Sequence, residues 1–241
     1  MAIFHLSMQI ITRGKGKSAV AAAAYRAGER ITNERDGYTH DYTKKKGIIH
    51  TEIFLPTHAP ADYKDRAVLW NAVEKIEANS NAQLAREIEF ALPVELSMEQ
   101  NISLAHEYVQ KYFVTHGMVA DVAIHDTDTG NPHCHVMLTL RPLNEDGTWG
   151  AKSRKEYILD KHGERIKLPS GEWKSRKVYT VDWNEKTKAE DWRKGWADTV
   201  NATFERLGIT ERLDHRSYER QGNGLIPTIH LGVAAHQMEQ K

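Results

Sequence analysis

The sequence predicts an α+β fold in which a central antiparallel sheet of about five strands is flanked by helices. Short segments rich in β-branched residues are bounded by turn residues, as strands usually are. Other segments repeat apolar residues at helical spacing. No strand–helix alternation with a phosphate-binding glycine motif is present, which argues against a parallel doubly wound sheet. We also expect most helices to pack on one face of the sheet, with an N-terminal helix at its rim.

Helix boundaries follow from capping residues. Ser18 is a suitable N-cap for an alanine-rich helix that we expect to extend to Ile31. Ser97 and Gln100 fit a capping box before a helix that Gly117 closes. A helical pattern also begins at Ala61, and beyond residues 79–81 it fits either a second helix or a strand. The expected strands are 3–11, 48–55, 118–125 and 132–141, and the further helices are 98–116, 186–207 and 234–241.

Composition is that of a globular protein, with 40% hydrophobic and 27% charged residues in 241. We expect a single domain over residues 1–241, interrupted by a loop-rich excursion or small β-hairpin at 144–182, and we expect further domains in the natural protein. The first residues show neither a basic region before an apolar core nor a small-residue cleavage site, and no apolar stretch is long enough to span a membrane. We therefore expect a cytoplasmic bacterial protein without membrane insertion.

Charge gives a mixed indication about nucleic-acid binding. The 33 basic and 33 acidic residues cancel, whereas proteins that bind phosphate usually carry a basic surface. The basic residues are clustered, however, and three of the four clusters fall in loop-like segments. Any one cluster is more simply explained as a solvated face, but four together favour a groove that binds phosphates. The clusters are Arg13, Lys15 and Lys17; Lys44 to Lys46; Lys152, Arg154 and Lys155; and Lys174, Arg176 and Lys177.

Three histidines are predicted to form a metal site. Residues alternate faces along a strand, so His133 and His135 share a face and Cys134 points to the other. Pairing His125 with His133 across a hairpin centres the turn on Thr129, in a turn-rich segment, and brings the third imidazole to the same face. Three imidazoles leave coordination positions open, as a catalytic site requires. An isolated His-x-His would favour a structural role, but the third histidine at matching register favours a metal.

A metal site of this kind needs a nucleophile from another part of the chain, and Tyr25 is the candidate. It is the polar aromatic residue of the alanine-rich helix, and the small side chains of 21–24 would let a DNA backbone approach. A tyrosine on a helix is more often a core residue with its hydroxyl at the surface. The residue pattern alone therefore leaves both roles open for Tyr25.

Several segments together resemble the MobA/MobL family of conjugative relaxases, which includes the TraA relaxases and the staphylococcal nicking enzyme. The resemblance spans nearly the whole chain, and the histidine order downstream of an N-terminal tyrosine is its most specific element. The segments are KSAVAAAAYRAGERI, QLAREIEFALP, NPHCHVMLTLRPL, RLDHRSYERQG and IPTIHLG.

This resemblance implies a histidine-hydrophobic-histidine (HUH) nuclease fold and function. Such an enzyme nicks single-stranded DNA at an origin of transfer, beside a DNA hairpin, and stays joined to the 5′ phosphate. Tyr25 would be the nucleophile, His125, His133 and His135 the ligands of one divalent metal, and Glu87 the residue that orients a ligand or accepts the tyrosyl proton. Manganese or magnesium is expected in function, although zinc, nickel or cobalt would also suit imidazole ligands.

The resemblance also suggests partners and DNA contacts. We expect relaxosome accessory proteins and a type IV secretion coupling protein as partners, and transfer of the protein to the recipient cell attached to DNA. Contacts to DNA are assigned to basic residues near the tyrosine and in the excursion. These are Arg13, Lys15, Lys17, Arg26, Lys152, Arg154 and Lys155.

Alternative functions remain open from the sequence. They are a rolling-circle replication initiator or transposase of the same chemistry, a DNA-binding module that its metal only stabilises, and a metal phosphoesterase that acts through water. His5 and His50 could reach the site or DNA, although burial with a backbone partner explains them more simply. His215, Arg216 and Tyr218 could contact phosphate, but a surface turn explains them equally well.

Overall fold

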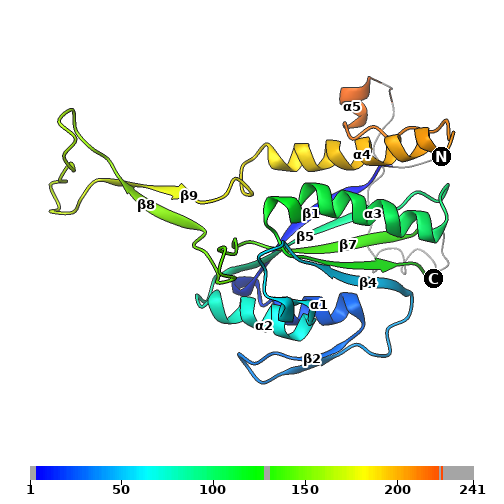
Figure 1. Cartoon of the computed structure of the whole chain (residues 1–241), viewed down its shortest axis with the longest axis horizontal. Helices are drawn as coiled ribbons and strands as arrows, with labels where there is room; N and C mark the ends of the chain where they lie inside the picture. The colour runs from blue at the N-terminus through cyan, green and yellow to red at the C-terminus, as the bar shows by residue number, and fades with distance from the viewer. Residues whose placement is uncertain (1–3, 128–130, 223, 225–241) are drawn as a thin grey trace.

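A computed structural model describes residues 4–127, 131–222 and 224, and its centre is a five-stranded antiparallel sheet (Figure 1). The strand order is β1-β5-β7-β6-β4, so the histidine-bearing hairpin lies in the interior of the sheet, as predicted. The bounds are β1 Leu6–Thr12, β4 Ile48–Phe54, β5 Gln83–Ala91, β6 Ala120–His125 and β7 His133–Thr139. The segment that fitted either a helix or a strand after residues 79–81 is therefore strand β5.

Helices cover both faces of this sheet, which corrects the expectation that most would pack on one (Figure 1). Helices α3 (Met98–Tyr112) and α4 (Lys188–Arg206) lie on one face, and α1 (Ala19–Ala27) and α2 (Arg66–Ile76) on the other. Each layer buries its own apolar core against the sheet. Two apolar faces need two covering layers, which explains the difference from the prediction.

Alternation along β7 divides its side chains between these cores. Cys134, Val136 and Leu138 are fully buried in the core beneath α3 and α4, while Met137 belongs to the core beneath α1 and α2. The tryptophan-rich face of α4 fills the first core, as its helical spacing predicts. His133 and His135 therefore point toward the α1 layer.

Helix α1 is shorter than predicted. The Ser18 hydroxyl accepts a hydrogen bond from the Ala21 amide at 3.2 Å, which confirms the N-cap. The helix ends at Ala27 because Gly28 adopts a left-handed conformation with φ of 66°. A Cβ on Gly28 would be strained at this φ and would lie 2.3 Å from the Ile48 side chain, which would have to move, so glycine is favoured there. The chain then forms a hairpin that the sequence did not predict, from β2 (Arg30–Thr32) and β3 (Thr39–Asp41).

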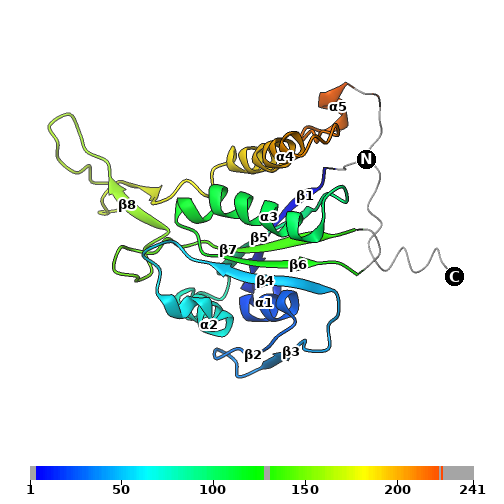
Figure 2. The same ribbon diagram turned by 45° about the vertical axis from the view of Figure 1, so that its right-hand side comes forward.

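The expected excursion at 144–182 contains an antiparallel pair, β8 (Ser153–Tyr157) and β9 (Ser175–Tyr179). This β8–β9 arm projects away from the body of the molecule in both ribbon views (Figures 1 and 2). Beyond these strands, isolated bridges between Leu159 and Arg165 and between Lys167 and Trp173 close two further turns. The arm is thus a hairpin rather than an irregular loop.

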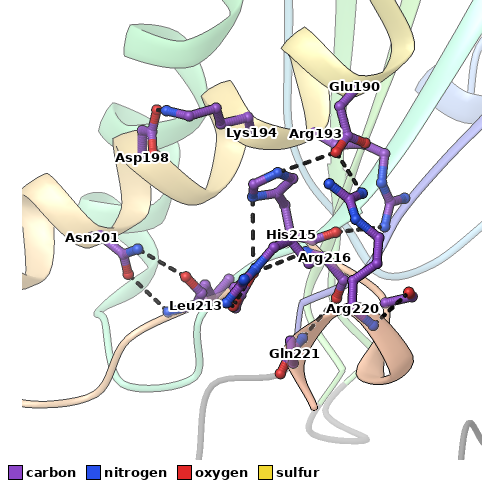
Figure 3. A network of polar contacts seen from close by, with 12 residues as sticks. Glu190, Arg193, Lys194, Asp198, Asn201, Leu213, His215, Arg216, Arg220 and Gln221 are labelled. Atoms are coloured by element: carbon purple, nitrogen blue, oxygen red, sulfur yellow. Dashed lines mark hydrogen bonds and ion pairs between the residues drawn. The ribbon is translucent and has the colours of Figure 1, made fainter.

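The segment after α4 returns along that helix and ends in α5 (Tyr218–Gln221). Figure 3 shows the polar contacts that hold it: Glu190 of α4 accepts a hydrogen bond from Arg220 at 2.6 Å and lies 3.4 Å from the His215 ring. Arg216 pairs with Asp214. His215 and Arg216 thus have partners within the protein, which agrees with their interpretation as part of a surface turn.

Short 3-10 helices complete the structure: η1 (Arg13–Lys15), η2 (Ala61–Lys64) and η3 (Val114–His116). The predicted helix at 234–241 and the turn centre Thr129 lie outside the described residues. Across the part of the chain that the structure describes, every helix is too short or too polar to cross a membrane.

Candidate metal centre and nucleophile

The three histidines converge on one face of the sheet, as predicted. His125 on β6 pairs directly with His133 on β7, and His135 follows two residues later on the same face. Their ring centroids are 4.9 to 5.4 Å apart, and one nitrogen from each ring lies within 4.8 Å of the others. Cys134 is buried on the opposite face, which confirms that it cannot be a ligand here.

Each ring is oriented by one acceptor. Nδ1 of His133 lies 2.9 Å from the Asn131 carbonyl, Nδ1 of His135 lies 3.0 Å from the Glu87 carboxylate, and Nε2 of His125 lies 2.6 Å from the Arg26 carbonyl. Carbonyl and carboxylate oxygens only accept, so each of these ring nitrogens carries the proton. The other nitrogen of each ring is then free to bind a metal, which is the usual arrangement around metal-binding histidines.

The donor set fits a divalent cation. Burial lowers the pKa of His125 to about 4, and although the hydrogen bond to Arg26 opposes this, nearby Lys45 and the other two histidines act with burial. His125 is therefore neutral at physiological pH, and the neutral imidazole is the form that binds metal. His125, His133 and His135 could hold the ion, which would polarise a phosphoryl oxygen and neutralise charge that develops on it. The donors do not fix which metal is used.

Glu87 lies beneath the triad and belongs to a buried polar cluster. Its carboxylate accepts hydrogen bonds from His135, from the Arg26 guanidinium and from Gln9, the last at 2.5 Å. Burial raises the pKa of Glu87, but the hydrogen bond from His135 and the charge of Arg26 outweigh burial and lower it to about 2. Glu87 thus carries a stable negative charge that fixes the orientation of the His135 ring.

Tyr25 lies in the last turn of α1, next to this cluster. Its neighbour Arg26 contacts the triad twice, through its carbonyl to His125 and through its side chain to Glu87. The Tyr25 side chain is 49% exposed, so it is not a core residue. By contrast, Ala23 and Ala24 are buried, so the small residues of this helix let it pack closely within the protein. The expectation that they make room for DNA is wrong for these two.

Lys45 holds the Tyr25 ring from the other side. Its ammonium lies 3.9 Å from the ring centroid and donates to the Tyr25 carbonyl at 3.0 Å, while Tyr42 packs edge-on against the ring. Burial, followed by repulsion from Arg26, lowers the pKa of Lys45 to about 8. The sequence placed Lys45 in a basic cluster but did not connect it with Tyr25. Likewise, only the β1–β5 register brings Gln9 opposite Glu87.

A hollow of about 370 Å³ opens beside the triad. His133 and Asn131 line one side, and Glu89 and Ala91 of β5 with His5 and Ser7 line the other. His5 therefore lies next to the metal centre. His50 does not, because its side chain faces His106 of α3 on the opposite face of the sheet.

The basic residues expected to bind DNA fall into two groups. Some hold the protein together: Arg13 pairs with Glu74, Arg26 with Glu87, and Lys152 with Glu77. The others are exposed and lie near α1 or on the β8–β9 arm, and these are Lys15, Lys17, Arg154 and Lys155. DNA binding stays a prediction for all seven.

The fold and site together define an α+β protein in which three histidines that could hold a metal ion converge on the sheet near the helix that carries an exposed tyrosine. The family model of the MobA/MobL family matches residues 17–241, and the chain belongs to that family.

Curated relatives match over the full chain. The conjugal transfer protein TraA of Agrobacterium fabrum is 43% identical over 254 residues, which cover 100% of this chain and 22% of TraA. The mobilization protein MobL of Acidithiobacillus ferridurans is 38% identical over 267 residues, which cover 100% of this chain and 65% of MobL. The chain thus spans only part of the length of these relatives.

A solved structure is also similar. It comes from work on the molecular basis of vancomycin resistance transfer in Staphylococcus aureus, and its chain is 32% identical with a TM-score of 0.77. The alignment covers 90% of this chain and 100% of that one.

Proposed function

We propose that this chain is a metal-dependent relaxase domain that nicks and rejoins one strand of DNA at an origin of transfer and so starts plasmid mobilisation. The observation that carries this proposal is the position of Tyr25: an exposed phenol one residue from Arg26, which contacts both His125 and Glu87. Family membership and relatives named for conjugal transfer and mobilization support it.

The proposed reaction is a transesterification. The Tyr25 phenol loses its proton and its oxygen attacks phosphorus, which forms a phosphotyrosyl bond to the 5′ phosphate. The bond to the 3′ oxygen breaks, and that oxygen takes up a proton to become a 3′ hydroxyl. The number of phosphoester bonds is unchanged, so the reverse reaction rejoins the strand without ATP. The divalent metal held by the three histidines would polarise a non-bridging oxygen of the scissile phosphate.

The side chains around Tyr25 would assist by charge and by position. A free phenol has a pKa near 10, so the nucleophile benefits from a nearby cation. The Lys45 ammonium over the ring would offset negative charge that develops on the Tyr25 side chain during attack. Of the two roles open for Glu87, orientation of His135 is the better supported, because a carboxylate with a pKa of about 2 is a weak base.

DNA would follow the basic surface between α1 and the β8–β9 arm. Lys15 and Lys17 are exposed just before α1, and Arg154 and Lys155 are exposed on β8. Single-stranded DNA near the nick and an adjacent hairpin are the proposed substrate, since phosphate contacts supply most sequence-independent affinity. The remaining proposed partners are relaxosome accessory proteins and a secretion coupling protein.

The test is an adduct assay with single-stranded oligonucleotides tiled over candidate origin-of-transfer sequences, in manganese or magnesium. We expect a covalent protein–DNA product on a denaturing gel that Tyr25→Phe and chelation both abolish. Tyr38→Phe is the matched control, because Tyr38 is exposed on the loop before β3.

Three other outcomes would contradict the proposal. An adduct with Tyr25→Phe would exclude this nucleophile. Cleavage without an adduct would indicate a phosphoesterase that uses water. A metal-dependent melting temperature without cleavage of any oligonucleotide would indicate a DNA-binding module.

A further inference from the structure

A second cluster of metal-ligating side chains lies on the face of the sheet opposite the triad. His50 and Glu52 are two residues apart on β4, so both point to the α3 side of the sheet. Their partners on β6 are Ile124 and Val122, which are buried in the core beneath α3. His106 of α3 lies directly over them. The β6 backbone therefore separates this cluster from the triad, and no residue is shared.

The three donor atoms are placed as ligands of one ion would be. The Nε2 atoms of His50 and His106 are 3.0 Å apart, and each lies 3.6 Å from the same oxygen, Oε2 of Glu52. A point equidistant from atoms with these separations lies about 2.0 Å from each, which is the length of zinc–nitrogen and zinc–oxygen bonds.

Hydrogen bonding alone accounts for this geometry less well. One ring nitrogen can donate to the other across 3.0 Å, but 3.6 Å from either ring to the carboxylate is longer than a hydrogen bond. The equal spacing of Glu52 from both rings has a simple explanation if a cation lies between the three groups.

The surroundings suit a site that exchanges with solvent. The side chains of His50, His106 and Glu52 are 26%, 27% and 38% exposed, so an ion can enter and a water molecule can complete its coordination. Phe54 packs edge-on against the His106 ring at 4.8 Å and limits its movement. Two imidazoles and one carboxylate are a typical zinc donor set and a poor one for magnesium.

We propose that His50, Glu52 and His106 bind a zinc-type divalent cation that cross-links strand β4 to helix α3. Among the described residues, β4 is an edge strand that pairs only with β6. A metal link from β4 to α3 would therefore restrain an edge of the sheet that has hydrogen-bond partners on one side only. The restraint would extend toward the active face, because Ile48 at the start of β4 pairs with His125 and follows the turn that carries Lys45. The ion would act through this cross-link, and its site is distinct from the triad.

The test counts bound zinc in the untagged full chain with a chromophoric competitor. We expect two equivalents for the wild type and one for the His133→Ala/His135→Ala variant. Adding His50→Ala and His106→Ala to that variant should remove the remaining equivalent. His116→Ala is the matched control, because His116 is exposed just beyond α3 and outside both clusters.

A second pair of measurements keeps the result independent of any one variant. With the triad intact, His50→Ala/His106→Ala should lower the zinc count from two to one. Zinc should also raise the melting temperature of the His133→Ala/His135→Ala variant, and this rise should be lost when His106→Ala is added. Absence of bound zinc in the His133→Ala/His135→Ala variant, or an unchanged count after substitution of His50 and His106, would overturn the proposal. Neither result depends on DNA cleavage.

Discussion

The triad and the β8–β9 arm differ in how firmly their side chains are held. His135 is fixed by Glu87, which is itself bonded to Arg26 and Gln9 in a largely buried cluster. The arm has no comparable core among its described residues: Tyr157, Trp173 and Tyr179 are exposed, and Tyr157 and Tyr179 lie under cationic side chains. Bond formation requires ligands in fixed positions, whereas binding a flexible polyanion requires accessible charge. We therefore propose that the chemistry takes place at the triad and that the arm contributes affinity for DNA.

The largest effect is expected when the metal centre loses a ligand. His135→Ala should lower the rate of adduct formation by about a thousandfold or more, because the charge on the phosphoryl oxygen is no longer neutralised. Its affinity for the oligonucleotide should change much less. Single-turnover adduct assays and fluorescence anisotropy separate the two quantities. Equal losses of affinity and rate would contradict the division between chemistry at the triad and DNA affinity at the arm.

A smaller effect is expected for the residue that orients this ligand. Glu87→Gln keeps the shape of the side chain but removes the charge that Arg26 and His135 share, and should cost about 10- to 100-fold in metal affinity or rate. Added manganese should restore part of the loss, which can be followed by titrating metal in the adduct assay. Ser7→Ala is the control, since Ser7 lines the hollow beside the triad and pairs with Glu89 rather than with Glu87. A metal-independent loss would instead indicate that Glu87 accepts the tyrosyl proton.

Substitutions in the β8–β9 arm are expected to change the affinity for DNA but not the rate of adduct formation. Arg154→Ala/Lys155→Ala should weaken oligonucleotide binding and reduce the slope of log affinity against log salt by about 1 to 2, because up to two phosphate contacts are lost. The rate of adduct formation at saturating DNA should be unchanged. Lys194→Ala is the control, because Lys194 lies on α4 and pairs with Asp198. An unchanged salt dependence would show that the arm does not bind phosphate.

The smallest effect is expected at the lysine over the nucleophile. Lys45→Met should slow adduct formation by about three- to tenfold, since a cation over an aromatic ring contributes roughly 1 kcal/mol. The pKa of Lys45 is lowered to about 8, so its ammonium is present below that pH and is lost above it. The ratio of wild-type to variant rates should therefore be largest below pH 8 and approach one above it. Lys44→Met should show no such trend, because Lys44 is exposed beside it.

Several features of this protein could be predicted from local sequence. Strand alternation places His133 and His135 on one face and Cys134 on the other, and hairpin register brings His125 opposite His133. Both follow from the two-residue period of a strand, which needs no knowledge of the rest of the fold. The cap at Ser18 and the capping box at Ser97 are equally local.

Other features depend on how distant segments pack. The sequence could not decide whether residues 83–91 form a helix or a strand, because their apolar residues fit both periods until β1 and β7 supply hydrogen-bond partners. The side chain of Ile48, twenty residues away, occupies the space that a Cβ at Gly28 would need, and only the packed fold shows this. The second histidine cluster has the same origin, since His50 and His106 are separated by 56 positions.

The sequence by itself therefore determined which face of the sheet carries the three histidines, because their spacing on a hairpin is a property of the backbone repeat. The role proposed for Tyr25 came instead from the family resemblance. Only the tertiary structure decided what surrounds them: Arg26 and Glu87 between Tyr25 and the triad, Lys45 over the ring, and helices on both faces of the sheet. Those arrangements arise from the burial of apolar surface by segments far apart in the chain, and no local pattern encodes which segments will meet.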